Sequence, residues 1–173
     1  LYTDDDKIDI KGQRYAPQFK PDWSPELLLS YMYFSHLCAV KRNLFETLGG
    51  MRVGFEGSQD YDFALRATEI ANKIAHLPLV LYHWRATPGS TAISGTAKPK
   101  SFIAGEKAVQ EALQRRGIKA TVYQPEWAVR LGLGLFSHKF PDTGPSVAIV
   151  IPTKNQVKLL QNCLTSLEKT TYQ

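Results

Sequence analysis

The stretch that decides the fold is "GSQDYDFALRATEIANKIAHLPLVLYHW", residues 57–84. Residues 57–74 predict the longest helix of the chain, with Ser58 as its N-cap. Residues 77–84, "LPLVLYHW", predict a strand that follows this helix. Helices and short apolar runs alternate in this way from Leu1 to about Ala86, as is typical of an α/β protein.

Three shorter elements are predicted before this stretch: helices in "DWSPELLLSY" (22–31) and "KRNLFETLGG" (41–50), and a strand in "HLCAV" (36–40). In the first helix Ser24 is the N-cap and Pro25 occupies the first helical position. Trp23 and Leu28 have the spacing of a hydrophobic staple. The second helix is expected to end at its two glycines.

Residues 87–100, rich in Gly, Pro, Ser and Thr, predict a loop that is either a lid over the site or a plain linker. Beyond it we predict a helix in "FIAGEKAVQEALQRRG" (102–117), strands in "IKATVY" (118–123), "WAVRLGLGLF" (127–136) and "VAIVIP" (147–152), and a last helix capped by Asn155. The buried stripe of that last helix is expected to comprise Leu160, Cys163, Leu164 and Leu167.

The composition is that of a soluble globular protein, since 43% of the 173 residues are hydrophobic and 21% are charged. No apolar run approaches the roughly 18 residues that a membrane span requires. Cys38 and Cys163 lie in apolar patterns, and we interpret them as reduced core residues of a cytoplasmic protein. The net charge of +5 is spread along the chain. It forms no cationic stripe interleaved with aromatic residues, so nucleic-acid binding is not indicated.

Asp4, Asp5 and Asp6 stand side by side in "YTDDDKID", residues 2–9. Adjacent carboxylates repel one another, and buried ones require protonation or a bound cation. The residues alone leave three interpretations open: a metal site, a solvated acidic turn, or the remnant of an expression tag.

The long helix contains two further aspartates. Asp62 and Arg66 are four residues apart, as are Glu69 and Lys73, so both pairs are expected to form ion pairs on one helix face. Asp60 lies about 200° around the helix from Asp62. Its carboxylate is either stabilised by the helix dipole or held at the edge of a cleft as a proton acceptor.

His83 lies near the end of the predicted strand 77–84. It is either a packed core histidine or, beside a cluster of carboxylates, a metal ligand. Oxygen ligands suit Mg²⁺ or Mn²⁺, and one imidazole shifts the preference toward Mn²⁺.

In their order, "YTDDDKID", "FKPDWSPELLLSY", "GSQDYDFALR" and "LYHWR" resemble the C-terminal half of a family-2 glycosyltransferase domain of the GT-A fold, most of all the bacterial polysaccharide and O-antigen enzymes. The tail "SVAIVIPTKNQVKLLQNCLTSLEKTTYQ" is similar to the first strand and helix of another such domain. The resemblance implies an α/β chain in three parts. These are the C-terminal half of a Rossmann-like GT-A domain with a mixed sheet (1–95), a small α+β spacer (96–145) and the first β–α unit of a second GT-A domain (146–173).

The function that the resemblance implies is inverting, metal-dependent transfer of a sugar from a nucleotide-sugar donor to a glycan or lipid-linked acceptor. Asp4 and Asp6 match the outer positions of the DxD motif that binds Mn²⁺ or Mg²⁺ and the donor diphosphate. His83 matches the histidine that completes the coordination of the metal in many relatives. Asp60 matches the general base, and Arg85 is assigned to the diphosphate.

Trp23 and Asp62 are placed on the acceptor side, although the hydrophobic staple explains Trp23 equally well. Gln59 stands where many relatives have a glutamate before the base. The first strands of the domain, which cradle the base and ribose, are absent from this sequence. We therefore expect the chain to be a fragment that does not catalyse transfer efficiently by itself.

A second class of function is a non-catalytic module that organises an assembly of polysaccharide-making enzymes. The joint presence of Asp4, Asp6, Asp60 and His83 argues against this class, because a decayed copy would be free to lose any of them. The expected location is the cytoplasm, with peripheral association of the parent protein at the inner face of the bacterial membrane.

Overall fold

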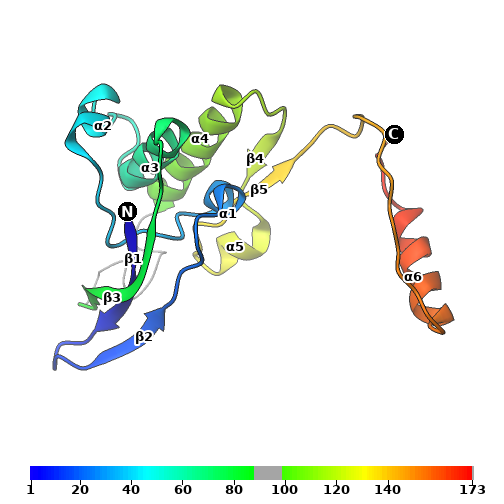
Figure 1. Ribbon diagram of the computed structural model, residues 1–173, viewed down its shortest axis with the longest axis horizontal. Helices are drawn as coiled ribbons and strands as arrows, with labels where there is room; N and C mark the ends of the chain where they lie inside the picture. The colour runs from blue at the N-terminus through cyan, green and yellow to red at the C-terminus, as the bar shows by residue number, and fades with distance from the viewer. Residues whose placement is uncertain (88–98, 173) are drawn as a thin grey trace. The chain divides into compact units, whose positions relative to one another are not determined.

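The computed structural model describes residues 1–87 and 99–172 and comprises two units, Leu1–Lys139 and Phe140–Gln173, whose elements are shown in Figure 1. Within these ranges no helix combines the length and the apolar character needed to cross a membrane. Residues 88–98, most of the predicted loop with its lid and linker interpretations, lie outside the described residues.

A three-stranded mixed sheet in the first unit has β1 (Tyr2–Ile8) at its centre (Figure 1). β1 pairs antiparallel with β2 (Arg14–Gln18) and parallel with β3 (His76–Arg85). The prediction of an α/β protein with a mixed sheet is therefore confirmed. The register places Asp6 opposite His83 on the neighbouring parallel strand.

The helices predicted in the first unit form α1 (Pro25–Ser30), α2 (Arg42–Thr47), α3 (Gln59–Ile70) and α4 (Pro99–Arg115). Ser58 precedes α3 as predicted, but its hydroxyl makes no capping bond to its own helix and instead donates to the Ser101 carbonyl at 2.7 Å. This bond ties the start of α3 to the first turn of α4. Gly117 ends α4 at a φ of 68°, and the Ile118 amide donates back to the Leu113 carbonyl.

One hydrophobic core joins α1, α3 and α4 to the first residue of β1. Its largest fully buried apolar side chains are Tyr2, Leu28, Leu65, Val109 and Leu113. Each such side chain contributes roughly 1.5–3 kcal/mol by leaving water. Because α4 supplies part of this core, the stretch predicted as a spacer packs together with the N-terminal part of the unit.

Two strand predictions in the first unit are wrong. "HLCAV" forms no strand, and its one bridge joins Cys38 to Tyr2. "WAVRLGLGLF" contributes the short helix α5 (Glu126–Arg130), followed by a turn at Gly132 with a φ of 63°. Its period-two pattern arises from glycines that end the helix and turn the chain. Only the flanking residues pair, as β4 (Thr121–Tyr123) with β5 (Ser137–Lys139).

The second unit contains α6 (Val157–Leu167), so the last predicted helix is confirmed. The stretch "VAIVIP" forms no strand, and the predicted apolar stripe of α6 is not buried. A strand requires a partner for its backbone groups, and none lies beside this stretch within the described part of the chain. Cys38 and Cys163 are reduced but exposed, so their assignment to the core is wrong.

Asp62, on α3, is the centre of a buried ion-pair network. Its side chain is 0% exposed and contacts both Arg52 and Arg66, with Arg66 Nη2 2.9 Å from Asp62 Oδ2. The predicted pair with Arg66 is therefore confirmed. Burial alone would raise the pKa of Asp62, but the hydrogen bonds from the two guanidinium groups outweigh burial and lower it. The predicted pair of Glu69 with Lys73 is wrong, because α3 ends at Ile70. Glu69 instead contacts Arg115, the last residue of α4, and Arg116, which follows it.

The substitution Asp62→Asn should lower the free energy of unfolding by about 3 kcal/mol or more at neutral pH, because it leaves two guanidinium groups without their countercharge. The pKa of Asp62 is lower in the folded state, so its contribution is present above the unfolded pKa of about 3.9 and is lost as the pH falls through the folded value. The free energies of unfolding of the wild type and Asp62→Asn should therefore converge as the pH falls. Urea denaturation of both proteins across an acidic pH series would measure this convergence.

The matched control is Glu46→Gln, which removes an exposed pair with Arg42 and should change the free energy of unfolding by at most about 0.5 kcal/mol. If the difference in free energy of unfolding between wild type and Asp62→Asn stayed constant down to the lowest pH, the lowered pKa of Asp62 would be contradicted.

Candidate functional site

The acidic triplet lies on the central strand of the sheet, and all three carboxylates are buried. The interpretation as a solvated turn is therefore excluded. Buried carboxylates require compensating charge or hydrogen bonds. The structure supplies these from β2, from the loop that follows β2 and from β3, and each aspartate has a different set of partners.

Asp5 is compensated by Lys20, whose side chain is only 3% exposed. Lys20 Nζ lies 2.7 Å from Asp5 Oδ2 and donates to the carbonyl of Thr3 at 2.7 Å. It also donates to the carbonyls of Phe34 and His36. The ammonium group therefore neutralises Asp5 and joins β1 to the segment around residue 36.

Asp4 is held by a histidine and by a backbone amide. Its Oδ1 lies 2.8 Å from His76 Nε2 and accepts a bond from the Lys20 amide at 3.0 Å. The other ring nitrogen of His76 lies 3.4 Å from Asp22 Oδ1. A chain of contacts thus runs from Asp4 through His76 to the exposed Asp22.

Asp6 forms the part of the triplet that borders on solvent. Its Oδ1 lies 2.6 Å from His83 Nδ1, and its Oδ2 accepts a bond from Arg14 Nε at 2.6 Å. Burial alone would raise the pKa of Asp6, but the contacts with His83 and Arg14 outweigh it and lower the pKa. The side chain of His83 is 38% exposed and that of Arg14 is 52% exposed, so this pair of residues is accessible to a ligand.

The candidate metal ligands that lie together are one carboxylate and one imidazole. Asp6 and His83 are in contact, whereas Asp4 is turned to His76. Among the described residues no group of three or more metal-ligating side chains is assembled. Mg²⁺ and similar ions are often held by one or two carboxylates together with substrate phosphates. The chemistry of Asp6 and His83 fits an ion whose other ligands come from a diphosphate.

The remaining candidate residues lie at other places in the first unit. Asp60 is exposed in the first turn of α3, and its Oδ1 accepts a bond from the Tyr61 amide at 2.9 Å. Although Cys38 is exposed as a residue, desolvation of its thiol raises the pKa of Cys38, and the Asp60 carboxylate raises it further. Cys38 pairs with Tyr2 at the start of β1.

Arg85 ends β3 opposite Ile8, two residues beyond His83, and is exposed. Trp23 lines a separate cavity beside α1. Asp62 has both carboxylate oxygens bound to guanidinium groups in the protein interior. This environment gives Asp62 a structural role and keeps it from the surface that an acceptor would reach.

No family model matches the chain. Over 171 residues, 96% of the chain, it is 39% identical to the O-antigen biosynthesis protein RfbC of Myxococcus xanthus. Over 172 residues, again 96% of the chain, it is 42% identical to the uncharacterized protein y4gI of Sinorhizobium fredii. The chain spans 13% and 18% of the lengths of these two relatives. It is similar to a segment of each.

Sequence reasoning missed Arg14, Lys20 and His76 as partners of the triplet. Lys20 is 16 positions from Asp4 and His76 is 72 positions from it, so no local spacing connects them. The available signal was the need of a buried triplet for nearby cations. The lysine of the "FKPDW" motif was the first candidate after β2.

Replacing Lys20 by Met should lower the free energy of unfolding by about 3–5 kcal/mol, because Asp5 would remain buried without its countercharge. Adding Asp5→Asn to this variant should restore a large part of the loss, since the uncompensated charge is then removed. Urea denaturation of the single and double variants measures both effects.

Lys11→Met, the same change at an exposed lysine, serves as the control. Equal stabilities of the Lys20→Met and Lys11→Met variants would show that the ammonium group is not required by the triplet.

Proposed function

We propose that this chain contributes the metal- and diphosphate-binding part of an enzyme that transfers sugars during the synthesis of bacterial surface polysaccharide. The observation that carries the proposal is the contact of Asp6 with His83 at 2.6 Å, on adjacent parallel strands, with the imidazole 38% exposed. The similarity to a protein named for O-antigen biosynthesis supports the choice of substrate class.

In this proposal Asp6 and His83 hold a divalent ion, and the imidazole favours Mn²⁺ over Mg²⁺. The ion would supply Lewis-acid stabilisation of the charge that develops on the diphosphate. Arg14 and Arg85 are exposed guanidinium groups near Asp6 and His83, so they can bind phosphate oxygens directly. The donor is then a nucleotide sugar, and the acceptor is a glycan or lipid-linked hydroxyl.

Asp4 has two alternative roles in the site. As a third metal ligand it would have to exchange the contact of its Oδ1 with His76 for one with the ion. As a positioning residue it would keep that contact and hold β1 in place. The variant Asp4→Asn distinguishes the two, because only a ligand role makes ion binding depend on the carboxylate.

Asp60 is the proposed general base for an inverting attack by the acceptor hydroxyl. Its carboxylate is exposed, so a hydroxyl group can approach it. One of its oxygens is oriented by the amide of Tyr61.

A second candidate function is a structural module of a polysaccharide-synthesis assembly. The observation that favours it is that Lys20, Arg14 and the two histidines already satisfy the triplet without an added cation. In that case the aspartates would stabilise the sheet and would bind no ligand.

Calorimetric titration with MnCl₂, in the presence and absence of UDP or GDP, separates the two functions. We expect Mn²⁺ to bind, and to bind at least about tenfold more tightly with a nucleoside diphosphate present. Asp6→Ala and His83→Ala should abolish this binding, whereas Arg42→Ala, an exposed change on α2, should leave it unchanged. A folded chain that bound neither Mn²⁺ nor its nucleotide complex would favour the structural module.

A further inference from the structure

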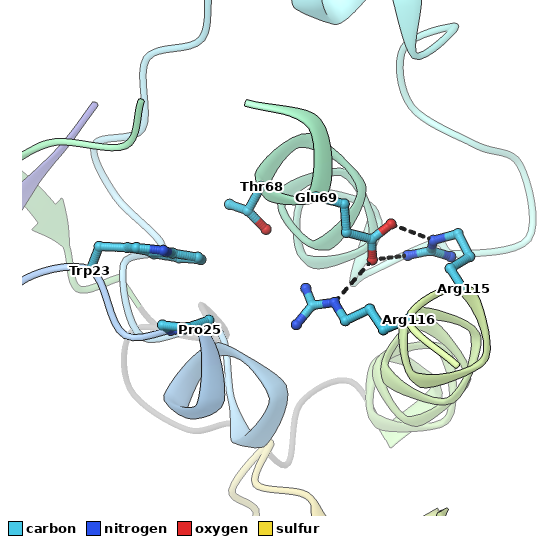
Figure 2. Close-up of a pocket in the computed structure, with 6 residues that line it drawn as sticks. All are labelled: Trp23, Pro25, Thr68, Glu69, Arg115 and Arg116. Atoms are coloured by element: carbon cyan, nitrogen blue, oxygen red, sulfur yellow. Dashed lines mark hydrogen bonds and ion pairs between the residues drawn. The ribbon is translucent and has the colours of Figure 1, made fainter. Parts of the chain in front are cut away.

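The first unit contains a concave site that is distinct from Asp6 and His83. It is a cavity of about 400 Å³, within the range of roughly 300–1,000 Å³ that is usual for ligand pockets. Figure 2 shows its walls, formed by the start of α1, the last turn of α3 and the end of α4. The lining residues are Trp23, Pro25, Thr68, Glu69, Arg115 and Arg116.

The charged wall of the cavity carries more positive than negative charge. Arg115 binds Glu69 through two bonds, from Nε at 2.7 Å and from Nη2 at 3.0 Å, so these two residues neutralise each other. Arg116 reaches the same carboxylate only through Nε, at 3.4 Å. Figure 2 shows its terminal nitrogens directed toward the open space that faces Trp23 and Pro25. One guanidinium group is therefore placed to bind an anion.

The opposite wall is apolar. The indole of Trp23, seen edge-on in Figure 2, and the ring of Pro25 lie across the cavity from Glu69 and Arg116. Trp23 is half-buried and packs against Phe34, with 6.4 Å between the ring centroids. An indole held in this way presents an apolar surface to a ring-shaped ligand.

The loop that carries Trp23 is also fixed to the acidic triplet. Asp22, the preceding residue, lies 3.4 Å from His76, which contacts Asp4. Lys20 from the same loop binds Asp5. The apolar wall is therefore positioned before any ligand arrives, which lowers the entropic cost of binding.

We propose that this cavity binds an anionic sugar, a pyranose ring that carries a carboxylate or a phosphate. The apolar face of the pyranose lies against Trp23, and the anionic group pairs with Arg116. A neutral sugar would leave the terminal nitrogens of Arg116 without an anionic partner from the ligand, and a free anion would leave the indole uncovered. The assignment of a sugar rests on the proposed function, and it makes the cavity a subsite for an acidic residue of the glycan acceptor.

The test is an NMR titration of the whole chain, with the indole N–H signal of Trp23 as the probe and those of Trp84 and Trp127 as internal references. Methyl glucuronide, glucose 6-phosphate, methyl glucoside and inorganic phosphate are added in separate titrations. We expect at least one anionic sugar to shift the Trp23 signal with a dissociation constant in the millimolar range, and the neutral glucoside to bind at least about tenfold more weakly. Binding of methyl glucuronide would identify a carboxylate as the group recognised, and binding of glucose 6-phosphate would identify a phosphate.

Arg116→Gln should weaken binding of the anionic sugar by about tenfold and leave the glucoside unaffected. The bond pair between Arg115 and Glu69 remains in this variant, so the fold is expected to persist. Arg130→Gln, at an exposed arginine of α5, is the matched control and should bind like the wild type.

Three results would overturn the proposal: no shift with either anionic sugar, equal affinity for the glucoside, or unchanged binding by Arg116→Gln. Asp6→Ala should leave the cavity intact. Sugar binding by Asp6→Ala shows that the subsite does not depend on the metal site. Sugar binding by the wild type, together with a failed Mn²⁺ titration of the wild type, would retain the subsite while rejecting the proposed metal site. Mn²⁺ binding by the wild type without binding of any anionic sugar would reject the subsite alone.

Discussion

The buried ammonium group of Lys20 is the interaction on which the first unit depends. It neutralises Asp5 at the centre of the sheet. Its position is fixed, because it also donates to carbonyls on β1 and on the segment around residue 36. The Lys20 amide at the same time binds Asp4. A charge buried to this degree is tolerated only when it is paired and hydrogen-bonded. The loop after β2, the central strand and the segment before α2 are therefore fixed together.

The elements that could be predicted from the sequence are those whose signals are local. The helices α3 and α4 carry their periodicity and their end signals within their own residues, and both were located correctly. Strand formation depends on a partner elsewhere in the chain. Residues 147–152 have the composition of a buried strand but no strand beside them in the described part of the protein. Residues 127–136 alternate at period two, yet Pro125 and Gly132 mark a short helix and its end.

The candidate site also combines features that the sequence predicts with contacts to residues distant in the chain that it does not predict. The proximity of Asp6 to His83 was expected from the resemblance to glycosyltransferases, which connects two motifs that are 77 positions apart. The partners of Asp4 and Asp5 could not be predicted from local patterns. Carboxylates act on charges over distances in space, whereas sequence patterns report separations along the chain. The cavity beside Trp23 could be predicted only in part. Trp23 was placed on the acceptor side, but the cationic wall comes from Arg115 and Arg116 at the end of α4, in the stretch predicted as a spacer.

The asymmetry in exposure around Asp6 determines how a ligand could enter the site. Asp6 is buried, whereas its partner Arg14 is 52% exposed. An exposed guanidinium group loses little when it leaves one partner for another, because water replaces much of the interaction. A buried carboxylate, by contrast, must retain a positive partner at all times. A cation that arrived at Asp6 could therefore take the place of Arg14 without leaving the carboxylate uncompensated. The released guanidinium group would then be free to bind the phosphates that accompany the cation.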